Sequence, residues 1–399
     1  MKSLRSLFKI GYGPSSSHTM GPRQAALRFL DELKAPASRF EVTLYGSLAA
    51  TGEGHMTDKA ILDVLSPNAP VAVFWEPETI LPFHTNAMRF KAFDNADDVI
   101  SEEVFYSIGG GDIVREGESV PDEPDIYDMT TISEILAWCK STGRSYWEYV
   151  EKCEGSEIWT FLKEVWEAMK ASIERGLEAE GVLPGPLGVS RKAVNYYVRA
   201  AGYNSSLKSR GLVYAYALAV SEENASGHQI VTAPTCGSSG VLPAVMYHLY
   251  TSKGFSEARI LRALATAGLF GNVVKENASV AGAEVGCQGE VGVACAMAAA
   301  AASQLFGGTP QQIEYSAEMG LEHHLGMTCD PVCGLVQIPC IERNAYAAAR
   351  ALDSNLYASF SDGTHSVSFD RIVKVMKQTG HDLPSLYKET ARGGLAVID

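Results

Sequence analysis

The chain has 399 residues, enough for two or three domains with a sizeable buried core. Hydrophobic residues make up 46% and charged residues 20%, which excludes a disordered chain, and 37 Gly with 17 Pro in no regular period exclude a collagen-like one. The formal net charge is −14. This charge argues against nucleic acid or an anionic membrane surface as the main partner.

Targeting and membrane signals are weak. The first residues, MKSLRSLFKIGYGP, carry positive charge but lack the apolar core and the cleavage site of a signal peptide. The longest nearly apolar run, 291–302, falls short of the roughly 20 residues that cross a bilayer. Eight cysteines without a secretory signal favour metal or catalytic thiols over a disulfide framework. We therefore expect a cytoplasmic protein.

The first part of the chain alternates helical and extended patterns. Period-3.6 segments predict helices, the second with Thr57 or Asp58 near its N-cap, and period-two or apolar segments predict strands. The helices are expected at 22–33 and 57–65, and the strands at 39–45, 71–76 and 103–108. These elements predict a small N-terminal α/β domain, residues 1–150.

Strand signals disappear after about residue 130. Helical spacing predicts helices at 157–180, 209–222, 243–253, 256–271, 289–306, 309–325, 335–355 and 368–379. Several are rich in Ala and Gly, as in VGVACAMAAAAA from Val291, and such helices pack closely only when buried against one another. We therefore expect a mostly all-α helical domain over 151–399 and an α+β chain overall.

The string GPSSSHTMGP, residues 13–22, stands directly before a predicted helix. Backbone N–H groups at a helix start and the hydroxyls of Ser15, Ser16, Ser17 and Thr19, with His18 beside them, can bind a carboxylate or phosphate. The alternative is a capping loop, because Ser and Thr favour N-caps. Both interpretations stay open on these residues alone.

His55 lies in the glycine-rich string TGEGHMTDKA, residues 51–60, just ahead of another predicted helix. Its imidazole can take a proton near neutral pH, and glycine leaves room for a substrate. A surface histidine in a flexible loop is the equal alternative.

The cysteines fall into two groups. We expect Cys139, Cys153 and Cys295 to be structural, the last as a small hydrophobe inside the Ala-rich helix. The others occupy Gly/Pro-rich turns: Cys236, Cys287, Cys329, Cys333 and Cys340. Zinc fits poorly because no CxxC pair or HxxxH partner appears, whereas iron–sulfur ligation is plausible without any of the usual ferredoxin spacings. Spacing alone leaves a metal site open.

Five strings, GPSSSHTMGP, GHMTDKA, SIGGG, NASVAGAEVGCQGE and CDPVCGLVQIPCIERNA, together resemble the bacterial iron–sulfur-dependent L-serine dehydratases, or L-serine ammonia-lyases. They recur in the family's order from residue 11 to residue 347. The chain resembles the single-chain form, in which the β and α parts are fused.

The resemblance implies a lyase that dehydrates L-serine to pyruvate and ammonia. It implies a 4Fe–4S cluster held by Cys287, Cys329 and Cys340, with one iron left open for Lewis-acid chemistry. It implies His55 as the candidate base that removes the α-proton. The active site is then expected where the two parts meet.

The resemblance also implies that Ser15 to Thr19 hold the substrate carboxylate, with His18 assisting. Arg343 is expected either to orient substrate or to form a salt bridge. Cys333 and Cys236 stand where the family's strings have other residues. Each could be a spare thiol near the cluster or an alternative ligand, so the assignment of the three cluster ligands stays open at these two residues.

Wider expectations follow from the same resemblance: a cytoplasmic homodimer acting in amino-acid catabolism and gluconeogenesis. The alternatives are the same cluster chemistry on L-threonine or L-cysteine, and a non-catalytic iron–sulfur sensor. A pyridoxal phosphate enzyme needs a Schiff-base lysine, and the nearest candidate is Lys275 in NVVKENAS.

Overall fold

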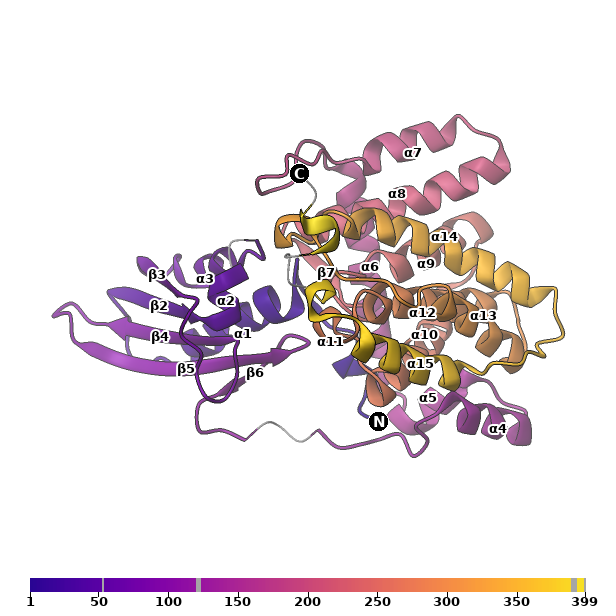
Figure 1. Ribbon diagram of the computed structural model, residues 1–399, viewed down its shortest axis with the longest axis horizontal. Helices are drawn as coiled ribbons and strands as arrows, with labels where there is room; N and C mark the ends of the chain where they lie inside the picture. Colours follow the sequence, from indigo (N-terminus) through magenta and orange to yellow (C-terminus); the bar gives the residue numbers. More distant parts are fainter. Residues whose placement is uncertain (52–53, 120–122, 389–392, 398–399) are drawn as a thin grey trace. The chain divides into compact units, whose positions relative to one another are not determined.

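The computed structural model describes residues 1–51, 54–119, 123–388 and 393–397 (Figure 1). The chain divides into two compact units. Gly11–Glu123 form the sheet unit, and Met1–Ile10 together with Pro124–Asp399 form the helical unit. The predicted α+β class, with a small sheet region before a mostly helical one, is confirmed. Residues 124–150 lie with the helical unit, and the functional domains expected at 1–150 and 151–399 stay a prediction.

The sheet unit is built on one mixed five-stranded sheet of order β3-β2-β4-β5-β6. Its strands are β2 (Arg39–Tyr45), β3 (Val71–Glu76), β4 (Ala87–Phe93), β5 (Val99–Gly109) and β6 (Asp112–Arg115). β2 and β3 run parallel, and the other neighbours are antiparallel. The strands expected at 39–45 and 71–76 are confirmed at both ends, and 103–108 lies within β5.

The helices of the sheet unit are α1 (Gly21–Asp31), α2 (Gly46–Thr51) and α3 (Thr57–Leu65). Alternate residues of β2 (Phe40, Val42 and Leu44) are buried in one core with Phe29 of α1 and Ile61 of α3. The period-two pattern of β2 therefore gives the sheet an apolar face that α1 and α3 cover. The two predicted helices are confirmed.

Thr57 lies next to the N-cap of α3, as the sequence predicted. Met56 holds the N-cap position with a left-handed backbone, φ 54°, and makes no side-chain cap bond. Thr57 is the first helical residue, and its hydroxyl donates instead to the carbonyl oxygen of His18 at 2.5 Å. A contact distant in sequence thus replaces the local cap.

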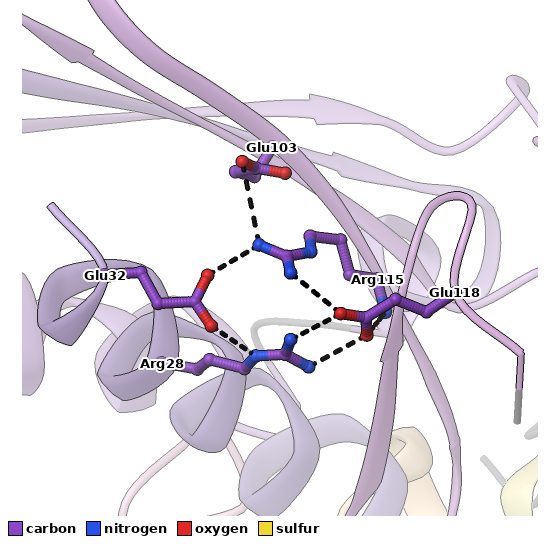
Figure 2. Close-up of polar contacts among 5 residues, drawn as sticks. All are labelled: Arg28, Glu32, Glu103, Arg115 and Glu118. Carbon is purple, nitrogen blue, oxygen red and sulfur yellow. Dashed lines mark hydrogen bonds and ion pairs between the residues drawn. The ribbon is translucent and has the colours of Figure 1, made fainter. Parts of the chain in front are cut away.

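A charged network ties α1 to the end of the sheet (Figure 2). Arg28 donates two hydrogen bonds to the Glu118 carboxylate, at 3.0 and 2.6 Å, and another to Glu32 at 2.8 Å. Arg115 on β6 pairs with Glu118 at 2.8 Å and with Glu103 at 3.8 Å. The hydrogen bonds from Arg28 lower the pKa of Glu118 to about 2, so this carboxylate stays charged.

The helical unit contains the remaining long elements of the described chain. Its α-helices are α4 (Ile132–Thr142), α5 (Tyr146–Glu154), α6 (Ile158–Glu178), α7 (Ala193–Ala201), α8 (Ser205–Ala225), α9 (Val241–Lys253), α10 (Glu257–Asn277), α11 (Gly282–Val285), α12 (Val293–Leu305), α13 (Pro310–Glu322), α14 (Cys340–Ser359) and α15 (Phe369–Asp382). The helices expected from 157 onward are confirmed, but α14 begins at Cys340, so the expected start at 335 is wrong.

Short elements complete the chain: η1 (Leu4–Ser6), β1 (Ile10–Tyr12), η2 (Ser16–Met20), β7 (Gln229–Val231), η3 (Gln288–Gly292), η4 (Val332–Gly334), η5 (Ser385–Tyr387) and η6 (Gly394–Val397). The strand β7 lies in a region where none was expected. Within the described ranges, no helix has both the length and the apolar character of a membrane span.

The Ala-rich helix α12 is buried along its whole length. Every side chain from Val293 to Leu305 is buried except that of Gln304. Small residues let neighbours approach closely: a Cβ on Gly320 of α13 would lie 3.1 Å from the Ala296 backbone. The expectation of a close-packed helical core is confirmed.

Candidate functional site

The serine loop forms one helical turn that runs straight into α1. The turn η2 spans Ser16–Met20, and Ser15 is its N-cap, with Oγ accepting from the His18 backbone N–H at 3.2 Å. The Ser15 N–H donates to Thr19 Oγ1 at 3.1 Å, and this hydroxyl donates to the carbonyl oxygen of His55 at 2.6 Å. Ser15 and Thr19 therefore fix the loop, as capping residues do.

His18 is buried, and both of its ring nitrogens face hydroxyl groups. Nδ1 lies 2.8 Å from Ser17 Oγ, and Nε2 lies 2.9 Å from Ser47 Oγ. Burial lowers the pKa of His18 to about 3, and the nearby His55 acts in the same direction. The imidazole is therefore neutral throughout the physiological range.

His55 packs edge-on against His18. The two ring centroids are 4.8 Å apart at an interplanar angle of 73°, and His55 is 3% exposed. Two hydrogen bonds join the serine loop and the His55 loop: the Thr19 hydroxyl donates to the His55 carbonyl, and the Thr57 hydroxyl donates to the His18 carbonyl. The residues singled out in two separate strings thus lie together in the sheet unit.

Two further serines belong to this cluster, and the sequence interpretation missed them. Ser47, in α2, contacts His18, and Ser107, in β5, donates to the Ser17 carbonyl at 2.7 Å. Both stand next to strand ends beside glycines, as Gly46-Ser47 and in SIGGG. Strand ends are where a sheet presents polar side chains, so their position was the available signal.

The three thiols implied by the resemblance lie at turns of the helical unit. Cys287 and Cys329 are buried, and the half-buried Cys340 is the first residue of α14. Burial raises the pKa of Cys287 to about 12; Glu290 acts in the same direction and the Arg343 guanidinium opposes it. Arg343 also interacts with Cys340, so one guanidinium serves two of the thiols.

Arg343 also holds the loop that carries Cys329. It donates to the Thr328 carbonyl at 2.6 Å and forms an ion pair with Asp330 at 3.4 Å. The neighbouring Asn344 is 1% exposed and binds the TAPTCG loop, donating to the Gly237 carbonyl at 2.8 Å. The ion pair with Asp330 thus supports the interpretation of Arg343 as a salt-bridge residue.

Glu290 lies beside Cys329 and was not singled out from the sequence, although it stands in the string GAEVGCQGE. One carboxylate oxygen accepts from Thr235 Oγ1 at 2.9 Å, and the other lies 3.7 Å from Cys329 Sγ. Burial raises its pKa. A Cβ on Gly282 would lie 2.5 Å from the same carboxylate, so glycine leaves the space that Glu290 fills.

The remaining cysteines differ in exposure. Cys236 is buried, whereas Cys333 is exposed with a left-handed backbone, φ 55°. Cys139 and Cys295 are buried and Cys153 is half-buried, in keeping with the expected structural roles.

The donor set around Arg343 suits an iron–sulfur group in its chemistry. Two of the three thiols, Cys287 and Cys340, interact with a guanidinium that offsets thiolate charge, and thiolate is the ligand that such clusters prefer. Across the described ranges, no group of three or more His, Cys, Asp or Glu side chains is arranged to hold a single metal ion. The residues therefore fit an iron–sulfur group by the type of their ligand atoms.

Fold and site together describe a helical protein with buried thiols and an N-terminal sheet unit carrying a Ser/His cluster. The serine dehydratase beta chain family matches residues 3–76, and the serine dehydratase alpha chain family matches residues 87–396. The chain therefore belongs to the serine dehydratase family.

Curated relatives are similar to this chain over nearly the full length of both sequences. The chain is 42% identical to the L-serine dehydratase of Streptomyces coelicolor, covering 99% of this chain and 98% of the relative. It is 40% identical to L-serine dehydratase 1 of Escherichia coli (100% and 99%) and 37% identical to the L-serine dehydratase of Helicobacter pylori (99% and 98%).

Proposed function

We propose that this protein is an L-serine dehydratase that converts L-serine to pyruvate and ammonia. The observation that carries the proposal is the full-length similarity to relatives of that name, in a single chain that joins both family parts. We further propose a cytoplasmic homodimer that acts in amino-acid catabolism and gluconeogenesis.

Cys287, Cys329 and Cys340 are proposed to hold a 4Fe–4S cluster. With three thiolate ligands, such a cluster supplies Lewis acidity at its one open iron, which suits the departure of a hydroxyl group without net redox change. Arg343 supports this role, because its guanidinium interacts with two of the thiols and its bonds to Thr328 and Asp330 hold the loop that carries the third.

His55 is proposed as the base. Its imidazole takes the α-proton of L-serine while the β-hydroxyl leaves, which gives aminoacrylate. This enamine tautomerises to an imine, and water then hydrolyses the imine to pyruvate and ammonia, so that the water released is consumed. The neutral His18 packs against the His55 ring, and we propose that it fixes the orientation of that ring without competing for the proton.

The serine loop is proposed to bind the substrate carboxylate. Ser15, Ser16, Ser17 and Thr19 present hydroxyls at the start of a helical turn, where backbone N–H groups also favour an anion. The internal bonds of Ser15 and Thr19 support this role, because they hold the loop in one shape before substrate arrives. Arg343 is proposed as a second group that orients substrate.

The first experiment is an assay on protein purified without oxygen. L-serine, L-threonine and L-cysteine are compared as substrates, pyruvate is measured for L-serine, and iron and sulfide are quantified in the same samples. We expect pyruvate from L-serine, with about four iron and four sulfide per chain. Activity in iron-free protein, or activity that depends on added pyridoxal phosphate, would contradict the cluster.

Single substitutions separate the two proposed sets of residues. We expect His55→Ala to keep its iron and sulfide but to lower kcat by at least about 100-fold, the usual contribution of a general base. We expect Cys287→Ser to lose iron, and Cys139→Ser to keep it because Cys139 is buried in α4 away from the turns. The exposed His381 gives a matched control, since His381→Ala should leave kcat unchanged.

A further inference from the structure

The helical unit contains a polar cleft of about 610 Å³ that the proposed reaction does not use. Its walls come from α4, the first turn of α13, the loop 360–368 and the first turn of α15. None of the cysteines, and neither Arg343 nor Glu290, lines it.

A buried acid–imidazole pair forms the floor of the cleft. Glu314 is 4% exposed; one of its oxygens accepts from the Phe369 N–H at 2.7 Å, and the other lies 2.8 Å from His365 Nε2. The His365 ring stacks face to face on Tyr315, with centroids 4.3 Å apart. The floor therefore places a carboxyl group and an imidazole within 2.8 Å of each other.

The loop that closes one side is fixed before any ligand binds. Gly363 has φ +85°, and a Cβ there would lie 2.8 Å from the side chain of Gln311 on α13. Gln312 donates to the Ser361 carbonyl at 2.9 Å. A cleft whose walls are held in this way loses little conformational entropy when it binds a ligand.

The rim carries two exposed cations. Lys140 on α4 and Arg371 on α15 are exposed, and neither forms an ion pair within the described part of the chain, although the protein has a net charge of −14. The remaining acid of the lining, Asp362, is exposed and accepts from the Thr364 N–H at 2.8 Å. Beside the Glu314–His365 pair, the lining thus holds two cations, Lys140 and Arg371, against one acid, Asp362.

We infer that this cleft is a binding site for a small anion that carries carboxylate or phosphate groups. Arg371 can hold two oxygens of such a group with its planar guanidinium, Lys140 adds a second charge, and the hydroxyls of Thr364 and Ser366 lie on the same loop. The site is separate from the proposed reaction, and its existence does not depend on that proposal.

Titration calorimetry on the full chain tests the inference. Inorganic phosphate, malonate and pyruvate are titrated separately at constant ionic strength, in a buffer free of all three. We expect saturable binding of one anion per chain; binding of phosphate alone would identify a phosphate site, and binding of malonate or pyruvate would identify a carboxylate site. No saturable binding by any of the three overturns the inference.

Paired variants locate the binding. Lys140→Gln with Arg371→Gln should weaken binding about tenfold for each cation removed, which corresponds to ~1.4 kcal/mol each. The control replaces Lys208 and Lys374, which are equally exposed but do not line the cleft, and should bind as the unaltered chain does. An equal loss of anion affinity in the Lys140/Arg371 pair and in the control pair would overturn the inference.

A third variant tests the sign of the ligand. Glu314→Gln removes a negative charge from the floor, so anion binding should be unchanged or tighter. Binding that is lost in Glu314→Gln but kept in the Lys140/Arg371 pair would indicate a cationic ligand and overturn the inference.

Discussion

At the scale of single residues, His18 is a buried imidazole whose hydrogen-bond needs are met by hydroxyls. A neutral imidazole has one donor and one acceptor nitrogen, and the hydroxyls of Ser17 and Ser47 can serve either. A protonated His18 would place a charge in a buried site against a second imidazole. The serine loop therefore depends on His18 remaining neutral.

This burial gives a pH dependence of stability. The folded pKa of His18, about 3, lies below the unfolded value of 6.5. Between these values the unfolded chain binds a proton that the folded chain does not, so the contribution of His18 is complete above pH 6.5 and is lost as the pH falls. We expect a loss of about 2 kcal/mol in the free energy of unfolding between pH 7 and pH 5.

Urea denaturation at several pH values measures this loss, and His18→Gln isolates it. The variant keeps a polar side chain without the titrating ring, so its stability should fall less than that of the unaltered chain over the same pH range, by the same ~2 kcal/mol. Equal slopes in the two proteins would show that His18 is not the group responsible.

The predicted site residues show what a linear sequence can and cannot give. The positions of His55, the serine loop and the cysteine turns follow from strings of ten residues or so that resemble one family. Glu290 and Ser47 were missed because their importance arises through space: one meets Cys329 across 39 positions of chain, and the other meets His18 across 29.

At the scale of elements, prediction succeeded where one face of an element packs against the core. β2, β3 and α3 have clear apolar periods, and their limits agree with the sequence. The helices α4 and α5 were not predicted, although both begin with a capping box, Thr131 with Glu134 and Ser145 with Glu148. Those boxes were a local signal, whereas the pairing of β4 and β6 depends on strands elsewhere in the sheet.

The crossing of α6 and α8 depends on one glycine. A Cβ on Gly176 would lie 2.4 Å from the Ala219 carbonyl oxygen, far inside van der Waals contact with backbone. Alanine favours a helix by up to ~1 kcal/mol over glycine, but here α6 and α8 must separate to admit the methyl group. We expect Gly176→Ala to lower the free energy of unfolding by about 1–3 kcal/mol, measured as a lower urea midpoint.

Gly202 provides the matched control for this substitution. It follows α7 with φ −82°, and the nearest atom to its added Cβ is 3.5 Å away. Gly202→Ala should change stability by less than about 0.5 kcal/mol. A Gly176→Ala protein as stable as the control would mean that the two helices have room at their crossing.

At the scale of the whole molecule, order along the chain and order in space differ. The first ten residues belong to the helical unit, although the sheet unit follows them in sequence. Asn272 and Lys275 of α10 donate to the carbonyls of Lys2 and Ser6 at 2.8 and 2.9 Å. The N-terminal segment is thus held by hydrogen bonds from side chains of α10 to its backbone, as well as by apolar contact.

Phe8 is the apolar anchor of that segment. It is 1% exposed, and its ring lies so close to Gly268 of α10 that an added Cβ would be 2.8 Å from Cε2. We expect Phe8→Ala to leave a cavity against α10 and to destabilise the helical unit by about 3–5 kcal/mol. Amide hydrogen exchange followed by mass spectrometry should then show faster exchange in peptides from α10.

Phe74 on β3 provides the control for Phe8→Ala, because it is also an aromatic residue but is exposed. It is 48% exposed, so Phe74→Ala removes a similar ring without opening a core and should leave exchange in α10 unchanged. If Phe8→Ala also left α10 exchange unchanged, the N-terminal segment would be a covering of the helical unit and not part of its core. The close approach at Gly268 argues for the core, because glycine at that helix position removes a side chain just where Phe8 and Leu4 enter.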